Sequence, residues 1–322
     1  MAKFRSNHTG SGKRDNKKSG FIIKAAVYGM VLVFFLWKLL NYFKAYENNE
    51  FQSASADTVP LSLPEEVENK KVFSAENAIS SIDLPNQTLT NTLVRHRHFT
   101  LSYSESNEQA EWVAYELTRD KLNAPKVGRF DYFSPDNDIL TRSALHRDYT
   151  GSGYTRGHLA PAADMAFDQK AAEESFYMSN ISPQEKYFNQ GVWRELEENV
   201  RDWARSNRSL FIVTGPVLNQ GIIKKIGENR VSVPYLFYKV VLDTTGIEKK
   251  GIGFVLPNKK SELPLEEYMV TVDSVEVLTQ LNFFNAVNKN SNIEVLESKI
   301  DKSAWPVNAE RYKKRINEWN KN

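Results

Sequence analysis

The sequence predicts an α+β domain with a central, largely antiparallel sheet flanked by helices, preceded by one transmembrane helix. Strand-forming segments open and close the body of the chain, and a charged helix stands between them. This order of strands, helix and further strands indicates the α+β class. The membrane helix is predicted from residues 21–43, which are apolar apart from two lysines.

The apolar segment 21–43 is long enough to cross a bilayer as a single helix. Its lysines, Lys24 and Lys38, stand near the ends, where long side chains can reach the lipid headgroups. Residues 1–20 carry six basic side chains against one acidic side chain, which predicts a basic cytoplasmic tail. We therefore expect a single-pass membrane protein, with the lipid bilayer as a partner and the body of the chain outside the cytoplasm.

Two other interpretations of the N-terminus fit the residues less well. A signal peptide would be cleaved just after its apolar run, but the small-residue triplet Ala54-Ser55-Ala56 lies more than ten residues beyond residue 43. A mitochondrial targeting segment would form an amphipathic helix, but residues 1–20 are rich in Gly, Ser and Asn with almost no apolar face. We expect the bacterial periplasm or cell surface in preference to the mitochondrial inner membrane.

Residues 44–83 are predicted to form a polar linker, and residues 84–322 a single domain. A mixed α/β domain of about 200 to 250 residues is a common size. The absence of cysteine from the whole sequence excludes a disulfide framework, a thiolate metal site and a cysteine nucleophile. Beyond the basic tail the chain is slightly acidic, so its bulk charge gives no support to a nucleic-acid partner.

Secondary structure is predicted from the apolar pattern and from turn residues. The expected strands are His98–Tyr103, Trp112–Leu117, Leu210–Thr214, Val233–Leu242 and Gly251–Leu256. The expected helices are Gly191–Arg205, Val272–Leu281 and Ala309–Trp319. The sequence contains no internal repeat, which argues against a solenoid.

The histidines differ in context. His158 follows Gly157, which allows the backbone to approach a ligand closely, although a histidine satisfied inside the core is the alternative. His96 and His98 are two residues apart and would share one face of a strand, either as a metal chelate or as a solvated surface. His146 lies between charged residues and is expected to be exposed.

An amide and a carboxylate flank the start of the long helix. Asn189 precedes it, while Glu197 and Arg201 lie within it. Eight residues along a helix correspond to a rotation of about 80°, so Asn189 and Glu197 can face one cleft. The alternatives are an N-cap at Asn189 and an ordinary i,i+4 ion pair between Glu197 and Arg201.

Three blocks in this order give the chain a recognisable pattern: Thr155–Pro161, Ser179–Gln184 and Asn189–Glu197. With them, the chain from about Val94 to Val287 resembles the DNA/RNA non-specific endonucleases of the ββα-metal (His-Me finger) type, which include endonuclease G and secreted bacterial nucleases. The resemblance implies a Mg²⁺-dependent, sugar-non-specific endonuclease, with Mn²⁺ as an alternative cofactor. It would hydrolyse DNA and RNA to 5′-phosphate ends and recognise them through backbone phosphates.

The resemblance also implies roles for individual residues at the metal. His158 would be the general base that takes a proton from the attacking water, a task that suits imidazole. Asn189 would be the single protein ligand of the metal ion, whose other positions are filled by water and phosphate oxygens. Glu197 would hold the water molecules of the metal.

Further residues would act on the phosphate or support the base. Arg156 and Arg129 would clamp the phosphate, since a guanidinium fork matches its oxygens. Asn180 would position His158 or the network of water molecules. Arg201 is a further candidate for the same cleft.

One residue departs from the family pattern. The family has aspartate where this chain has Thr155, which keeps an oxygen for hydrogen bonding but loses the charge. Because His158, Asn189 and Glu197 are present, we predict an active enzyme. A catalytically weak or inactive nucleic-acid-binding module is the alternative. The basic run Arg311–Arg315 would either extend the phosphate track or form a solvated helix face.

Overall fold

The computed structural model of the chain describes residues 84–86, 91–128, 130–243, 245, 249–283 and 296–321. The chain divides into two units, Met1–Val72 and Phe73–Asn322, and every described residue lies in the second unit. The predicted tail, membrane span and linker therefore lie outside the described residues. Within the described ranges, no helix is both long and apolar enough to cross a bilayer.

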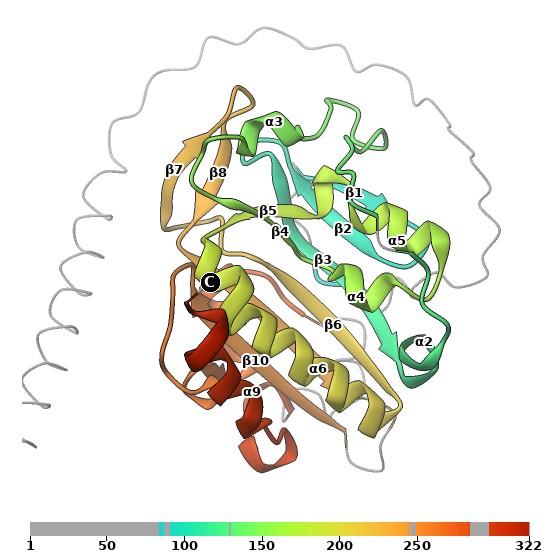
Figure 1. Cartoon of the computed structure of the whole chain (residues 1–322), viewed down its shortest axis with the longest axis vertical. Coiled ribbons are helices and arrows are strands. Elements are labelled where there is room, and N and C mark those ends of the chain that lie inside the picture. The colour runs from blue at the N-terminus through green and yellow to red at the C-terminus, as the bar shows by residue number, and fades with distance from the viewer. Residues whose placement is uncertain are drawn as a thin grey trace, which may run out of the picture. The chain divides into compact units, whose positions relative to one another are not determined.

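A seven-stranded sheet forms the centre of the second unit (Figure 1). In spatial order its strands are β1 (Thr92–Arg95), β2 (Thr100–Ser104), β3 (Gln109–Thr118), β6 (Ser209–Pro216), β9 (Leu236–Asp243), β10 (Lys250–Pro257) and β11 (Met269–Val270). Every neighbouring pair in this sheet is antiparallel. The predicted central antiparallel sheet is confirmed.

Helix α6 (Arg194–Asn207) is the longest described helix and packs against β3 and β6 (Figure 1). Its buried side chains Leu196, Val200 and Trp203 recur every three or four residues and form the apolar stripe that faces the strands. Further described helical segments are α2 (Arg119–Asn123), α3 (His146–Tyr149), α4 (Ala162–Met165), α5 (Gln169–Ser175), α7 (Val272–Thr279), α9 (Ala309–Lys314), η1 (Met178–Asn180), η3 (Leu265–Tyr268), η5 (Lys302–Ala304) and the π-helical turn η6 (Arg315–Trp319).

Both faces of the central sheet are buried. On β3, Val113, Tyr115 and Leu117 belong to one hydrophobic cluster, which includes the apolar stripe of α6. The alternate residues Trp112 and Ala114 belong to a second cluster, which includes the buried side chains of α7. This division follows the two-residue period of a strand and gives the sheet a core on each face.

One strand prediction is wrong in its extent. The predicted strand Val233–Leu242 is divided at Tyr235. Its first residues belong to β8 (Val231–Pro234), which pairs with β7 (Ile222–Ile226) in a separate hairpin. Pro234 has no N–H with which to continue a ladder, and the chain changes sheets there.

A compact strand pair and α6 form the predicted ββα arrangement. Strands β4 (Thr155–His158) and β5 (Ile181–Gln184) pair antiparallel, and the chain then enters α6 through the π-helical turn η2 (Phe188–Trp193). Gly157 is required in this pair, because an added Cβ would lie 2.1 Å from Cδ of Gln184. The helix prediction began too early, since η2 occupies its first residues.

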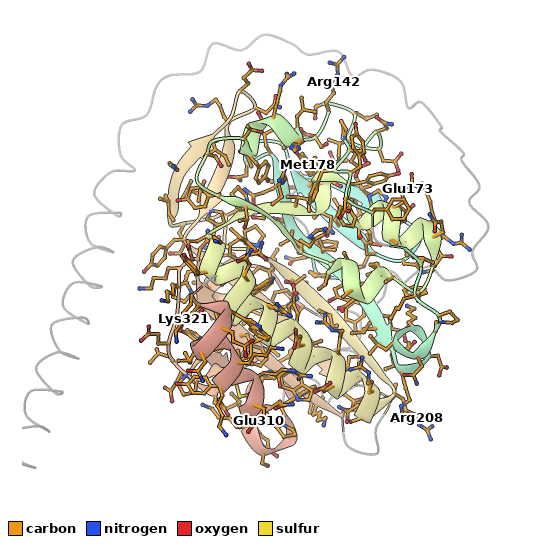
Figure 2. The ribbon with its side chains drawn as sticks, in the orientation of Figure 1. Arg142, Glu173, Met178, Arg208, Glu310 and Lys321 are labelled. Atoms are coloured by element: carbon orange, nitrogen blue, oxygen red, sulfur yellow. The ribbon has the colours of Figure 1, made fainter. Side chains whose placement is uncertain are left out.

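The interior and the surface carry different side chains (Figure 2). Arg142 and Glu173 extend into solvent, whereas Met178 is fully buried. Two cationic side chains depart from this pattern, because Lys239 and Arg315 are almost completely buried. A buried charge is costly unless it is paired, so both side chains need a physical explanation.

Candidate active site

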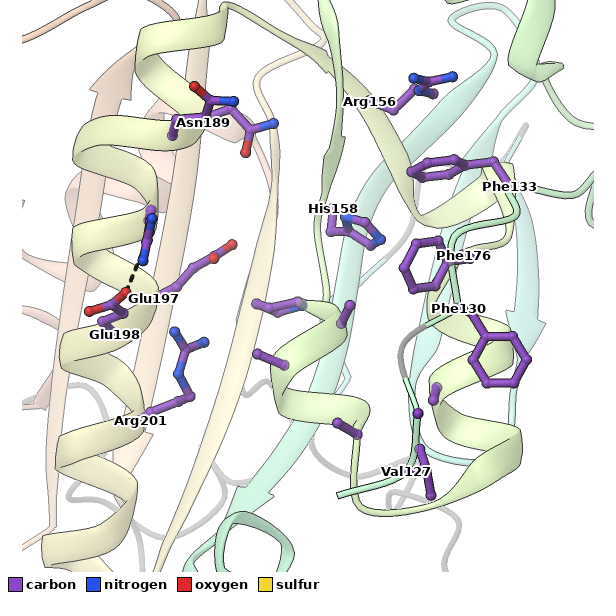
Figure 3. A pocket seen from close by; sticks show the side chains of 18 residues that line it. Val127, Phe130, Phe133, Arg156, His158, Phe176, Asn189, Glu197, Glu198 and Arg201 are labelled. Carbon is purple, nitrogen blue, oxygen red and sulfur yellow. Dashed lines mark hydrogen bonds and ion pairs between the residues drawn. The ribbon is translucent and has the colours of Figure 1, made fainter. Parts of the chain in front are cut away.

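A pocket of about 660 Å³ lies between α6 and β4 (Figure 3). It is lined by Val127, Gly128, Phe130, Phe133, Arg156, His158, Pro161, Ala162, Ala163, Ala166, Ala172, Phe176, Asn189, Gln190, Arg194, Glu197, Glu198 and Arg201. The pocket brings together five of the candidate residues: Arg156, His158, Asn189, Glu197 and Arg201. Figure 3 shows the α6 residues on one side, the aromatic residues on the other, and His158 between them.

His158 is the last residue of β4 and lines the pocket. The ring of Phe176 packs edge-on against its imidazole, with centroids 4.8 Å apart and an interplanar angle of 80°. Phe133 packs on the imidazole as well, at a centroid distance of 5.6 Å. These two aromatic rings restrict the orientation of the imidazole while it remains in contact with the pocket.

Asn180 lies behind His158 and does not line the pocket. Its buried side chain accepts a hydrogen bond from the Ala160 amide at 2.9 Å and donates to the carbonyl oxygens of Ala160 and Ser175 at 3.0 and 2.8 Å. The Asn180 carbonyl also accepts from the Leu159 amide at 2.9 Å. These hydrogen bonds hold the chain that follows His158, whereas the predicted positioning of His158 or of the network of water molecules stays a prediction.

Asn189 lies in η2 and faces the pocket from the α6 side (Figure 3). Its Nδ2 donates to Oγ1 of Thr155 at 2.9 Å, and that hydroxyl donates to the Gln184 carbonyl at 2.9 Å. The hydroxyl proton is thus used on Gln184, and a lone pair receives the amide of Asn189. This chain of hydrogen bonds leaves Oδ1 of Asn189 as the oxygen available to the pocket.

Glu197 lines the pocket from α6. Burial raises the pKa of this carboxyl to about 7, although the positive charges of Lys239 and Arg201 oppose the rise. Asp164 contributes to the rise as a neighbouring negative charge. The carboxyl therefore changes its charge near neutral pH, well above the ordinary range of a glutamate.

Arg201 connects the pocket to a buried acid. Its Nη1 donates to Oδ1 of Asp164 at 2.9 Å, and the Tyr115 hydroxyl donates to the other carboxylate oxygen at 2.9 Å. The alternative interpretation, an i,i+4 pair with Glu197, is absent from the ion pairs of the described residues, because the guanidinium turns to Asp164. Sequence reasoning missed Asp164 and Tyr115, which come from α4 and β3.

Lys239 is a second charged group that sequence reasoning missed. It lies on β9 in an otherwise apolar run, and that contrast was the available signal. Among the described residues its Nζ has no hydrogen-bond partner, and it lies 4.8 Å from the centroid of the Trp193 ring. Burial lowers its pKa to about 8, and the nearby Glu197 carboxylate opposes that change.

Arg156 stands at the mouth of the aromatic side of the pocket. Its guanidinium carbon lies 4.9 Å from the centroid of the Phe133 ring, and its Nη1 lies 2.8 Å from Nδ1 of His146. His146 is exposed, as predicted, but its contact with Arg156 was not foreseen. Arg129 lies outside the described residues, although its neighbours Gly128 and Phe130 line the pocket.

The prediction that His96 and His98 share a strand face is wrong. They lie in the turn between β1 and β2, which is closed by a hydrogen bond from the His96 amide to the Phe99 carbonyl. His96 Nε2 lies 3.0 Å from Oδ2 of Asp136, whereas buried His98 lies 3.5 Å from a carboxylate oxygen of Asp168. The two rings therefore meet different carboxylates, and neither residue lines the pocket.

The donors on the α6 side suit a hard divalent cation. Asn189 offers an amide oxygen whose orientation is set by Thr155, and Glu197 offers carboxylate oxygens from the same wall. Mg²⁺ is typically bound by one or two protein oxygens and retains several water molecules. The residues present fit such an ion at Asn189, with Glu197 placed to hold its water molecules.

Comparison with known proteins identifies a matching family and several similar nucleases. A family model described as DNA/RNA non-specific endonuclease matches residues 77–290. Human mitochondrial nuclease EXOG is 34% identical over 222 residues, which are 64% of this chain and 60% of EXOG. Human mitochondrial endonuclease G is 33% identical over 198 residues, which are 58% of this chain and 67% of that protein.

A fungal relative and a solved structure extend the comparison. Nuclease C1 of Cunninghamella echinulata is 34% identical over 206 residues, covering 59% of this chain and 81% of its own. A chain in the crystal structure of the EndoG/EndoGI complex superimposes with a TM-score of 0.57 at 32% identity, covering 61% of this chain and 87% of that one. The chain spans only about 60% of the length of human EXOG.

Proposed function

The chain belongs to the family of DNA/RNA non-specific endonucleases, and we propose that it hydrolyses phosphodiester bonds of DNA, and of RNA, to 5′-phosphate ends with Mg²⁺ or Mn²⁺. The observation that carries this proposal is the pairing of His158 with Asn189 across one pocket. An imidazole packed against two aromatic rings lies across the pocket from the side-chain amide of Asn189, whose Nδ2 donates to Thr155. A base and a cation ligand are the two groups that metal-assisted hydrolysis requires.

In this mechanism the residues of the chain divide the work. His158 takes a proton from the water that attacks phosphorus as the bond to the 3′ oxygen breaks. Asn189 would hold the cation through Oδ1, and Glu197 as a carboxylate would orient the water around it. The cation, when bound, supplies positive charge at the scissile phosphate. Arg156 and Arg129 hold the phosphate oxygens, and stacking on Phe133 orients the guanidinium of Arg156.

The proposal is tested with the full chain and supercoiled plasmid DNA in Mg²⁺. We expect cleavage in Mg²⁺, loss of cleavage in excess EDTA, and strong loss in both His158→Ala and Asn189→Ala. Mn²⁺ titration calorimetry on the same proteins should show binding that Asn189→Ala abolishes. Persistent cleavage in EDTA, or a wild-type rate in His158→Ala, would overturn this mechanism.

The same assay decides the alternative of a binding module without catalysis. Thr155 was the reason for that alternative, but its hydroxyl keeps the hydrogen bonds that orient Asn189. A protein that retains plasmid in a gel-shift assay without nicking it would be such a module. Comparison of cleavage rates on single-stranded DNA, duplex DNA and RNA then defines the preferred substrate.

We also propose that residues 21–43 anchor the chain in a bilayer, with residues 1–20 in the cytoplasm and the nuclease domain on the other side. The support is the length of the apolar run and the basic character of the tail. The expected result is a protein that stays with membranes in alkaline carbonate, while protease added outside the cytoplasmic membrane removes the domain. Release of the full chain by carbonate would contradict the anchor.

A further inference from the structure

The C-terminal segment, residues 296–321, packs along α6 and lies beyond the part of the chain that matches the family model (Figure 1). Trp203 of α6 donates from its indole to the Pro306 carbonyl at 2.8 Å, and the Asn308 amide donates to Oδ1 of Asn199 at 2.9 Å. The segment thus joins the middle of α6 through specific hydrogen bonds.

Arg315 contacts the N-terminal end of α6. Its side chain is completely buried, and its Nε donates to Oε2 of buried Glu195 at 2.5 Å. Its Nη1 and Nη2 donate to the carbonyl oxygens of Ser261 and Leu263, both at 2.6 Å. A buried guanidinium tolerates little displacement when its donors are used in this way, because a lost partner leaves a charge unsatisfied.

The same segment abuts the backbone of η2 at Gly191. The backbone departs from helical geometry there, at φ −104° and ψ −107°. A Cβ on Gly191 would lie 2.7 Å from Oδ1 of Asn320 and 3.8 Å from Cδ of Arg315. Asn320 is itself held, since its Nδ2 donates to the Ser261 carbonyl at 2.9 Å. Asn320 and Arg315 of the C-terminal segment therefore lie directly against the turn that carries Asn189.

Two further contacts reach residues that line the pocket. The Arg194 guanidinium carbon lies 4.1 Å from the centroid of the Trp319 ring. Arg194 also donates to Glu198 at 2.9 Å, and Arg311 pairs with the second oxygen of Glu198 at 3.1 Å. The C-terminal segment thus contacts Arg194 and Glu198, which line the pocket on the same side as Asn189.

We propose that residues 296–321 act as a brace that positions turn η2 and so directs Oδ1 of Asn189 toward the cation, with Arg315 as the central positioning residue. This inference rests on the proposed function, because it concerns the same cation. Thr155 fixes only the amide end of the Asn189 side chain, whereas the backbone that carries it is kinked at Gly191.

Mn²⁺ titration calorimetry on the full chain tests the brace without relying on turnover. Arg315→Met removes the fork that joins Glu195, Ser261 and Leu263. We expect it to weaken Mn²⁺ affinity by about 10 to 100-fold, the usual effect of losing a group that orients a metal ligand. The matched control is Trp305→Leu, which removes a buried side chain of the same segment that packs on Trp203. It should lower the melting temperature but leave Mn²⁺ affinity at the wild-type value.

Asn320→Ala keeps the test decisive if Arg315→Met does not fold. This change removes one hydrogen bond and the contact with Gly191 without leaving a buried charge, and we expect affinity about fivefold weaker. Wild-type affinity in every folded variant of Arg315 and Asn320, or an equal loss in Trp305→Leu, would overturn the brace. Failure of the proposed function looks different: the wild-type chain would not bind Mn²⁺, or Asn189→Ala would bind it normally.

Discussion

The functional groups on the two walls of the pocket are oriented by different kinds of interaction. The base wall comprises His158, Arg156 and the aromatic residues Phe133 and Phe176, and ring packing orients its functional groups. The helix wall comprises η2 and α6, and hydrogen bonds and buried charges orient its groups, as between Asn189 and Thr155.

This difference matches the two roles that the walls have in the proposed reaction, a general base on one and a cation ligand on the other. A base must change its protonation state during the reaction, and aromatic packing restricts its ring while leaving it in contact with the pocket. A cation ligand must hold one oxygen in a fixed direction, which needs hydrogen bonds from the opposite side. We therefore expect changes in the base wall to reduce turnover, and changes in the helix wall to reduce cation affinity first.

His158→Ala should give the largest difference between the effect on turnover and the effect on cation affinity. Removal of a general base typically costs about 10² to 10⁴-fold in rate. Because the imidazole belongs to the base wall, Mn²⁺ affinity measured by calorimetry should stay at the wild-type value. Plasmid cleavage and calorimetry on one preparation make the comparison, and a parallel loss of cation affinity would show that the walls are not independent.

Glu197→Gln should act in the opposite sense, on the helix wall. Loss of the carboxylate that orients water around the cation should weaken Mn²⁺ affinity by about 10 to 100-fold. Glu198→Gln, one residue further along α6, should cost far less, since Arg194 and Arg311 already neutralise that carboxylate. Equal effects in the two variants would remove the special role of Glu197.

The pKa of Glu197 predicts how cation affinity depends on pH. Burial raises that pKa to about 7, so the carboxyl gains a proton as the pH falls through 7 and loses the charge that binds water and cation. Mn²⁺ affinity should fall by up to about tenfold for each pH unit below 7, the slope of a single ionisation, and level off at the affinity of Glu197→Gln. In Glu197→Gln this dependence should disappear, and its persistence would assign the titration to another group.

Thr155→Val tests the hydrogen bond that orients the cation ligand. Valine has a similar shape but cannot accept the Nδ2 proton of Asn189, so we expect Mn²⁺ affinity to fall about fivefold, the equivalent of about 1 kcal/mol for one hydrogen bond. Thr155→Ser keeps the hydroxyl and should bind Mn²⁺ as the wild type does. A strong loss in both variants would point to packing of the methyl group instead.

The residues that line the pocket and the residues packed behind them were predictable from the sequence to different degrees. Arg156, His158, Asn189 and Glu197 come from two short blocks that are each continuous in the chain, β4 and η2 with α6, so their roles could be transferred by resemblance. The groups behind them could not be predicted. Asp164 meets Arg201 and Arg315 meets Glu195 only because tertiary packing joins residues far apart in the sequence.

Local geometry accounts for the other misses. His96 and His98 were assigned to a strand because alternation in a short segment resembles a strand, but a single backbone hydrogen bond from His96 to Phe99 closes a turn there. Similarly, the predicted strand Val233–Leu242 runs across Pro234, where the chain changes sheets, because the apolar residues continue on both sides of that proline. Periodicity reports which residues are buried, whereas strand partners depend on contacts that a local pattern does not contain.

Phe133→Leu should give the smallest effect and provides the finest comparison of the walls. Leucine fills the space but removes the ring that lies 4.9 Å from the Arg156 guanidinium carbon, an interaction worth about 0.5 to 1 kcal/mol at an exposed site. We expect KM for DNA to rise about two- to fivefold, because Arg156 would be less well oriented for the phosphate. Mn²⁺ affinity should not change, since Phe133 has no part in the helix wall. If turnover fell and KM did not rise, the ring would act mainly on His158, its other neighbour at 5.6 Å.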